Sequence, residues 1–147
     1  EHDNKINHLL NKFKKEIPKQ GIFFNGQIFD SYEFVCNLIK KAKKKIILID
    51  NYIDESILTI FSKTNVKVII YTKNINNKLK LDFKKYNSQY ENIRIKEFNQ
   101  SHDRFLIIDN EIYQIGASLK YLGKKWFGFS KFNKEDLIKI LDELTII

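Results

Sequence analysis

The sequence predicts a single α/β domain, a sandwich whose central sheet is at least partly parallel and flanked by helices. Short apolar segments alternate along the chain with amphipathic segments of about ten residues, the order typical of a sheet covered by helices. The chain has 147 residues with one proline and five glycines. That size and composition suit one compact domain with its own core.

The start of the chain predicts a short helix over residues 1–17, where apolar side chains recur at helical spacing. Pro18 ends it. The chain contains no methionine, so we expect residues 1–20 to be a helix or linker from a longer protein. Residues 21–147 are then the folded domain.

The segment GIFFNGQIFD (21–30) predicts a β-hairpin, because its Asn-Gly dipeptide is the strongest short-range signal for a two-residue turn. Asp30 and Glu33 have the spacing of a capping box. We therefore expect an amphipathic helix over 31–43.

The middle of the chain predicts alternating strands and helices. The continuous apolar run KIILID (45–50) indicates a strand that is buried on both faces. The expected strands are 45–50, 66–72 and 92–98, and the expected helices are 54–62 and 76–86. The run KKAKKK (40–45) is expected to be a solvated helix end, and phosphate binding is the alternative.

The segment SHDRFLIIDNEIYQIGAS (101–118) predicts a strand, a tight turn at Asp109-Asn110 and a returning strand. Residues 119–132, which are basic and aromatic, are expected to be irregular. A final amphipathic helix is expected at about 134–144.

The formal charge is +8, from 26 Lys and Arg against 18 Asp and Glu. Such a charge favours anionic partners, either nucleic acid or a membrane surface. Alternatively, the positive charge only reflects an overall composition rich in Lys, Asn and Ile.

The single cysteine, Cys36, excludes an internal disulfide. No run reaches the roughly 18 apolar residues of a membrane span, and no secretory signal is visible. We expect a cytoplasmic protein that binds nucleic acid, DNA before RNA.

His102 and Arg104 begin an otherwise plain buried run. Two residues apart on a strand, they would point to the same face. A histidine can attack phosphorus or transfer a proton near neutral pH, and a guanidinium can hold two phosphate oxygens. Asp109 has the opposite parity, so a structural role at the turn suits it better. His102 is therefore either a catalytic residue or an ordinary histidine of the surface or the core.

The complete spacing, His102-x-Arg104-x4-Asp109-x6-Gly116, resembles the HKD signature of the phospholipase D superfamily. With the strand order before the motif, the resemblance covers roughly residues 23–132. It implies a phospholipase D-like sandwich with a central mixed, largely parallel sheet. Within the superfamily, the motif region is most similar to the C-terminal domain of phage-type DNA-binding regulators with a KilA-N-like N-terminal domain.

The resemblance also implies a mechanism. One histidine becomes a phosphohistidine, and a second, from another copy of the motif, protonates the leaving oxygen. No metal or other cofactor takes part. A chain with one motif then requires a symmetric homodimer to supply both histidines, and the substrate is a phosphodiester, usually of nucleic acid in short single-motif members.

The chain departs from the family signature at several positions. Arg104 stands in place of lysine, Ala117 in place of the serine after the glycine, and Lys120 where an asparagine is expected. The carboxylate that orients the nucleophilic histidine in nuclease members would fall near Ser130, which is no acid. Asp50 and Glu111 are the possible substitutes.

Two readings follow. In the first, the chain is a dimeric, metal-independent nuclease in which His102 is the nucleophile and Arg104 binds the phosphate. Ser118 and Lys120 are the supporting donors, and Asp109 holds the hairpin. In the second, it is a degenerate module for dimerisation and nucleic-acid binding. Both have the same expected phosphate and nucleic-acid contacts: Arg104, Lys120, Lys124, Lys125 and Trp126. Phospholipase activity is disfavoured, since no apolar segment suited to docking on a membrane is present.

Overall fold

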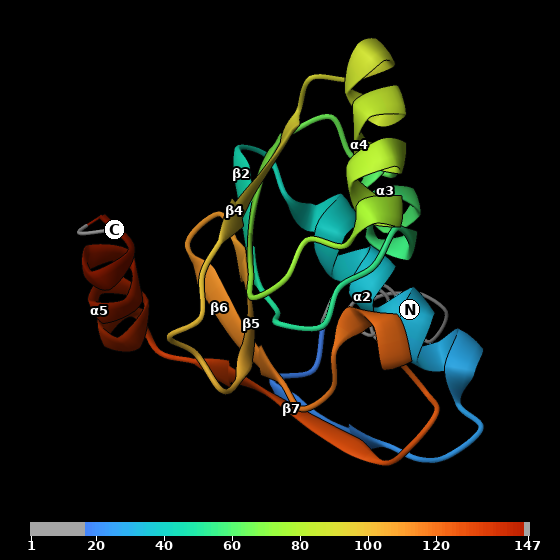
Figure 1. Cartoon of the computed structure of the whole chain (residues 1–147). Coiled ribbons are helices and arrows are strands. Elements are labelled where there is room, and N and C mark those ends of the chain that lie inside the picture. Colours follow the sequence, from blue (N-terminus) through green and yellow to red (C-terminus); the bar gives the residue numbers. More distant parts are fainter. Residues whose placement is uncertain (1–16, 146–147) are drawn as a thin grey trace, which may run out of the picture.

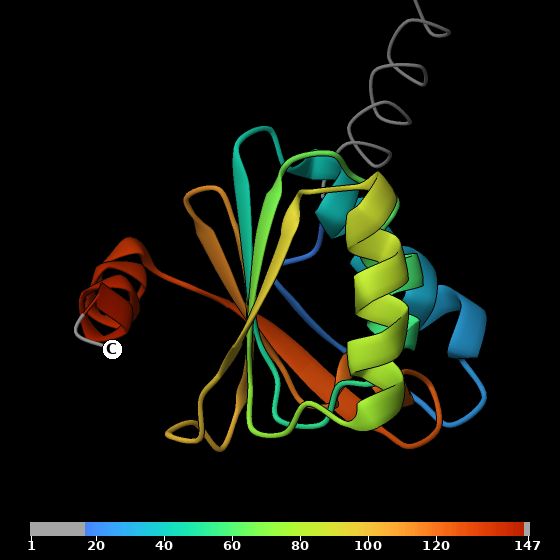
Figure 2. The same cartoon turned by 45° about the horizontal axis from the view of Figure 1, so that its top comes forward.

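The computed structural model describes residues 17–145, which form a seven-stranded sheet with three helices on one face and one helix on the other. The elements are β1 (Gln20–Phe23), α2 (Ile28–Lys41), β2 (Lys45–Ile49), α3 (Ser56–Phe61), β3 (Lys67–Thr72), α4 (Asn77–Gln89), β4 (Ile93–Glu97), β5 (Arg104–Ile108), β6 (Glu111–Ile115), the 3-10 turn η1 (Leu119–Tyr121), β7 (Phe127–Phe132) and α5 (Lys134–Thr145). Helices α2, α3 and α4 cover one face of the sheet, and α5 lies against the other (Figures 1 and 2). The helix expected over residues 1–17 lies, apart from its last residue, outside the described part.

The predicted α/β sandwich is confirmed, but the sheet is less parallel than expected. The strand order is β1-β7-β6-β5-β2-β3-β4. Only the β2–β3 and β3–β4 pairs are parallel, and the other pairs are antiparallel. The reason is the β5–β6 hairpin, which adds to the edge of the parallel strands and reverses the chain direction twice.

Strand β2 is buried on both faces, as the apolar run at 45–50 predicted. Along β2, Ile46 and Leu48 join the core under α2, α3 and α4, whereas Ile47 and Ile49 join the core under α5. Successive side chains of a strand point to opposite faces, so both faces must be apolar when both are covered. The predicted strands at 45–50, 66–72 and 92–98, and the helices after them, are confirmed with small shifts at their ends.

The predicted hairpin at residues 21–30 is wrong. Strand β1 pairs with β7 and not with the segment that follows it. The Asn25-Gly26 turn instead leads into α2, with Gly26 at a φ of 93°. Gln27 begins the helix, and its side-chain oxygen accepts the N–H of Phe24 at 2.7 Å. Asp30 is therefore a first-turn residue, not the cap. A local turn signal cannot exclude a distant partner strand.

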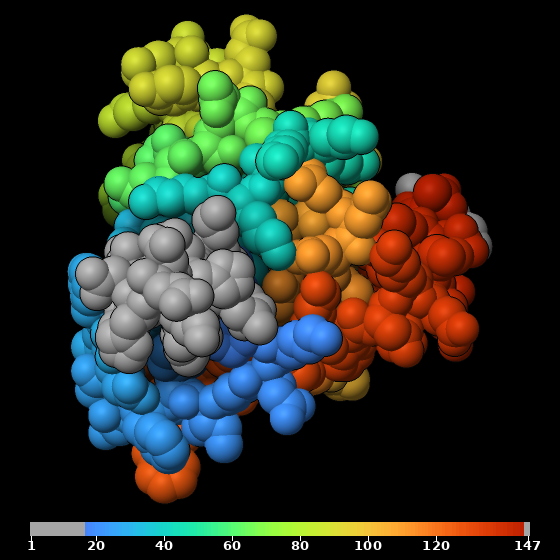
Figure 3. Space-filling view, turned by 180° about the vertical axis from the view of Figure 1, so that it is seen from behind, coloured from blue at the N-terminus to red at the C-terminus, as the bar shows by residue number. Residues whose placement is uncertain are grey.

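Strand β7 was missed, since residues 119–132 were expected to be irregular. Its sequence, FGFSKF, contains glycine, serine and lysine, which weaken a strand pattern. Two neighbouring strands and a cluster of rings compensate: Phe129 packs on Phe34 at 4.2 Å and Phe127 on Phe23 at 5.3 Å between ring centroids. In Figure 3 the blue β1 segment accordingly lies beside the orange-red surface of β7 and α5.

Asp109 occupies the β5–β6 turn with a φ of 53°, a conformation that Asp tolerates better than most residues. Its carboxylate accepts the backbone N–H groups of Lys43 at 2.9 Å, Lys44 at 2.8 Å and Lys45 at 3.0 Å. Partial desolvation alone would raise the pKa of Asp109, but these donors and the Lys44 charge together lower it. The Asp109 carboxylate therefore fixes the start of β2.

Replacing Asp109 by Asn should lower the free energy of unfolding by about 1.5 kcal/mol, the lower end for hydrogen bonds to a charged group. Asn keeps the tolerance for positive φ but loses the charge and one acceptor oxygen. Because the folded pKa is lowered, the stabilisation is complete above the ordinary aspartate pKa and is lost as the pH falls through the folded pKa.

Urea unfolding at neutral and acidic pH measures this effect. The difference between Asp109→Asn and the wild type should close in acid, while Asp142→Asn on the exposed side of α5 serves as the control. Equal midpoints for the wild type and Asp109→Asn at neutral pH would show that the turn carboxylate contributes nothing.

Candidate functional site

One edge of the sheet collects the residues that the motif predicted to act. Strand β5 runs antiparallel to both β2 and β6, so that Ile49 pairs with Phe105 and Arg104 pairs with Ile115. The residues that follow β2 and β6 therefore lie beside the start of β5. The sheet register brings Asp50 and Gly116 to the same edge as Arg104.

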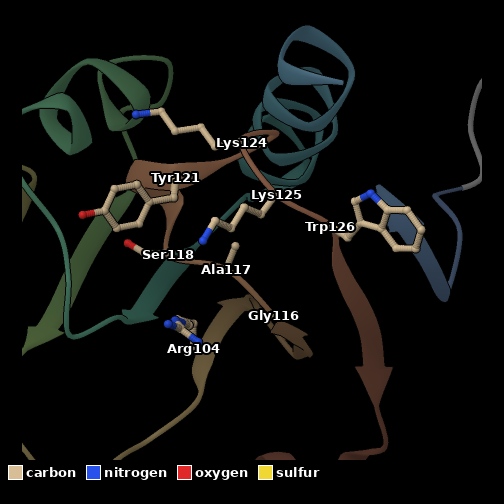
Figure 4. A pocket seen from close by; sticks show the side chains of 8 residues that line it. All are labelled: Arg104, Gly116, Ala117, Ser118, Tyr121, Lys124, Lys125 and Trp126. Carbon is tan, nitrogen blue, oxygen red and sulfur yellow. The ribbon is translucent and has the colours of Figure 1, made fainter. Parts of the chain in front are cut away.

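A pocket of about 460 Å³ opens at this edge. In Figure 4, Arg104 and Lys125 reach toward the same space from opposite sides, over Ala117, while Tyr121 and Trp126 stand on either flank. The lining residues are Arg104, Gly116, Ala117, Ser118, Tyr121, Lys124, Lys125 and Trp126. Cations in the centre and rings at the sides are the groups that would contact phosphate and a flat organic group, respectively.

Arg104 is half-buried, and its guanidinium lies over the ring of Tyr52 at 5.7 Å from the ring centroid. The ring is attractive to the cation and limits its movement. A planar guanidinium can donate two parallel hydrogen bonds to a phosphate, which a lysine cannot. Arg104 therefore gives the pocket a cation whose shape differs from that of a lysine.

Asp50 is a fully buried carboxylate, with 0% of its surface exposed, directly behind the pocket. One oxygen accepts the Ser118 hydroxyl and the Leu119 N–H, each at 2.9 Å, and the other accepts the Tyr52 N–H at 3.0 Å. Desolvation raises the pKa of Asp50, opposed by these hydrogen bonds and by the Arg104 charge. Asp50 thus ties the loop after β2 to the loop after β6.

Gly116 is required by the approach of β7 to the floor of the pocket. Its N–H donates to the carbonyl of Gly128 at 2.8 Å, and a Cβ on Gly116 would lie 2.9 Å from that same oxygen. Any side chain here would push β7 away from β6. The motif glycine therefore has a packing reason that is independent of chemistry.

Two lysines, one within η1 and one in the loop after it, lie around one aromatic ring. The Nζ of Lys120 lies 5.0 Å and that of Lys124 5.4 Å from the centroid of Tyr121. Lys124 and Lys125 line the pocket, whereas Lys120 does not. The loop closes on the start of α2, because Gly26 donates its N–H to the carbonyl of Gly123 at 3.1 Å.

His102 lies on an exposed bend before β5, which begins two residues later than the motif suggested. The Nδ2 of Asn51 donates to the Ser101 carbonyl at 2.6 Å, and the Ser101 hydroxyl donates to the Asp103 carbonyl at 2.8 Å, so the bend itself is fixed. His102 is at the same edge as Arg104 but is not among the residues that line the pocket.

The two carboxylates considered as orienting groups for His102 have other partners. The Asp50 carboxylate already accepts hydrogen bonds from the Tyr52 N–H, the Ser118 hydroxyl and the Leu119 N–H. Glu111 forms ion pairs with Lys41 at 2.7 Å and with Lys131 at 3.1 Å. Desolvation alone would raise the pKa of Glu111, but the two lysines together lower it. Both acids are thus accounted for by structural roles.

Of the predicted site residues, the structure brings Arg104, Ser118, Lys124, Lys125 and Trp126 into one pocket. Ser118 is buried, and its hydroxyl donates to Asp50. Asp109 lies at the opposite end of β5, at the turn.

Sequence reasoning missed three residues around the pocket. Tyr121 lines it, Tyr52 lies under the Arg104 guanidinium, and Phe24 packs against Trp126. Tyr121 could have been found from the alternation of lysines and rings in its segment. Phe24 could not, because nothing in the local sequence links it to Trp126.

No protein-family model matches the chain, and no curated protein matches it. Solved structures do match. NucT from Helicobacter pylori superposes with a TM-score of 0.62 at 15% identity, over 85% of this chain and 92% of NucT. TrmBL2, an archaeal chromatin protein with a novel mode of DNA binding, superposes with a TM-score of 0.58 at 15% identity, over 97% of this chain. The polyphosphate kinase of Porphyromonas gingivalis gives a TM-score of 0.60 at 14% identity, over 88% of this chain.

The matched region is the larger part of NucT but only part of the others, since the chain spans 57% of TrmBL2 and 22% of the polyphosphate kinase. NucT and the polyphosphate kinase have folds of the phospholipase D superfamily. At these identities the likeness shows the fold alone. The chain has a phospholipase D-like α/β fold, with its pocket at the end of the motif strand.

Proposed function

We propose that the domain binds the phosphodiester backbone of nucleic acid in the pocket at the start of β5. The observation that carries this proposal is that Arg104 and Lys125 reach into one space over a floor of small residues, which Lys124 also lines. Three cations around one concave site suit a polyanion, and the net charge of +8 attracts it over distance. TrmBL2, which binds DNA, shares the fold, and so does NucT. This likeness is consistent with nucleic acid as the ligand.

Metal-independent hydrolysis of the bound phosphodiester in a homodimer is the second candidate. It is favoured by His102, which is exposed two residues before the pocket's arginine and therefore accessible to a second copy. In that mechanism the imidazole of one protomer attacks phosphorus and forms a phosphohistidine, while its partner's His102 protonates the leaving oxygen. Water then attacks the phosphohistidine and releases the product.

The degenerate alternative retains binding without turnover. Neither Asp50 nor Glu111 is free to orient His102, since each accepts donors elsewhere. An imidazole without an orienting acceptor has no fixed tautomer and is a weaker base. In this form the domain would serve a longer, phage-type DNA-binding regulator of the KilA-N-like kind, as the motif resemblance suggests.

Binding should weaken steeply with salt if the pocket cations neutralise phosphates. Lys124→Ala and Lys125→Ala should each reduce the slope of log K against log[salt] by about 1, the share of one phosphate contact. Fluorescence anisotropy of a labelled oligonucleotide across a salt series measures this slope. Lys63→Ala, an exposed change at the opposite edge of the sheet, should leave it unchanged. A slope near zero for the wild type would contradict the proposed function.

Cleavage should depend on His102 and Arg104 in different ways. His102→Ala should abolish cleavage and leave folding intact, since the side chain is exposed. Arg104→Lys restores the family's cation and should keep or raise activity, whereas Arg104→Ala should lose about 1.5–3 kcal/mol of phosphate binding. EDTA should not inhibit. Gel assays on single- and double-stranded DNA and RNA measure this. If the wild-type protein binds these nucleic acids but cleaves none of them, the hydrolysis hypothesis is excluded and the binding hypothesis stands.

The two-histidine mechanism requires a dimer in solution. Light scattering at micromolar concentration should give twice the chain mass of 17.6 kDa, for the wild type and for His102→Ala alike. A stable monomer at that concentration would rule out the shared site and leave binding by a single protomer.

A further inference from the structure

The rim of the pocket carries two exposed aromatic side chains that the core does not use. Trp126 is 71% exposed and Phe24 is 47% exposed. Their rings meet edge to face, with 4.9 Å between centroids. A large exposed ring pair beside a charged pocket is the kind of surface that a ligand covers. Trp126 is the single tryptophan of the chain.

The backbone holds this pair in a fixed place. Gly123, three residues before Trp126, has a φ of 78°, and a Cβ there would lie 2.4 Å from the Cα of Ile28. The loop is therefore seated directly on the first turn of α2, next to Phe24. On the other side Phe127 continues into β7. Rings presented on a rigid frame lose little freedom when a ligand binds.

The cations next to the rings define the ligand. Lys125, the residue before Trp126, and Arg104 reach into the pocket that Trp126 flanks. A phosphate between the cations would leave the attached nucleoside within reach of the rim. A second copy on the same surface would bring Lys124 and Lys125 against like charges, whereas a polyanion neutralises them. Charge therefore selects nucleic acid as the occupant.

Resting on the proposed nucleic-acid binding, we propose that Trp126, supported by Phe24, stacks an unpaired nucleobase while Arg104 and Lys125 hold its phosphate, so that single-stranded nucleic acid is the preferred ligand. In a duplex the faces of each base are covered by its neighbours, and only the edges are offered in the grooves. An unpaired base offers a free face, and any base can stack on a ring.

The single tryptophan makes the test direct, because its emission reports on this rim alone. Titration with a short oligothymidylate should quench the emission of the wild type. A blunt duplex of equal phosphate content should quench it less and bind roughly tenfold more weakly, given the strength of base–aromatic stacking. Anisotropy of the labelled strands gives the affinities independently of the tryptophan.

Variants separate the stacking from the charge. Trp126→Ala should weaken single-strand binding roughly tenfold and leave duplex binding unchanged, and Trp126→Phe should restore most of the loss. Lys125→Ala should weaken both ligands alike. Tyr90→Ala, at an aromatic residue 49% exposed on the far edge of the sheet, is the matched control and should change neither.

Three outcomes would overturn the inference. Equal losses for both ligands in Trp126→Ala, or no loss, exclude base stacking while the proposed binding stands. An emission that shifts with protein concentration alone, together with a doubled mass that Trp126→Ala abolishes, shows that a second copy covers the rim. Absence of binding to either ligand at low salt contradicts the proposed function itself.

Discussion

The buried carboxylate of Asp50 is the contact on which the pocket depends. It sits at the end of β2 without exposure to solvent and accepts hydrogen bonds from the loop after β6. A buried charge is costly unless its oxygens are satisfied, so the loops that supply the donors cannot move apart without leaving it unpaired. The position of Ser118, and with it the pocket floor, follows from this one constraint. The nearby Arg104 charge opposes the effect of desolvation on the carboxylate.

Two aspartates thus fix the two ends of the central antiparallel pair β2 and β5. Asp109 joins the turn after β5 to the start of β2, and Asp50 joins the end of β2 to the chain after β6. Neither carboxylate faces the space into which Arg104 and Lys125 reach, so that space remains positive and suited to phosphate. The same frame would serve the proposed binding alone or the proposed binding followed by attack from His102. What distinguishes the two is whether the imidazole of His102 has an orienting acceptor.

The sequence was sufficient where the physical signal is local. The continuous apolar run at 45–50 predicted a strand buried on both faces, and the Asp109-Asn110 dipeptide predicted the tight turn between β5 and β6. The signal failed where pairing is distant. The Asn25-Gly26 turn predicts a local hairpin, but the strand before it, β1, pairs with the distant β7. Strand β7 in turn is a strand because of its neighbours β1 and β6 more than because of its composition. The contact of Phe24 with Trp126 was unpredictable for the same reason.

The pairing of β1 with β7 has a kinetic consequence. Gln20 is opposite Ser130 in the sheet, so the first described strand has no partner until almost the whole domain has been synthesised. Phe23 and its partner Phe127 are about 100 residues apart, so at about 5–20 residues per second on the ribosome the segment waits for roughly 5–20 seconds. During that interval Phe23 lacks the rings of Phe127 and Phe129 that cover it in the folded protein. The contact between Phe24 and Trp126 beside the pocket spans the same distance in sequence, so this ring pair also forms only late in synthesis.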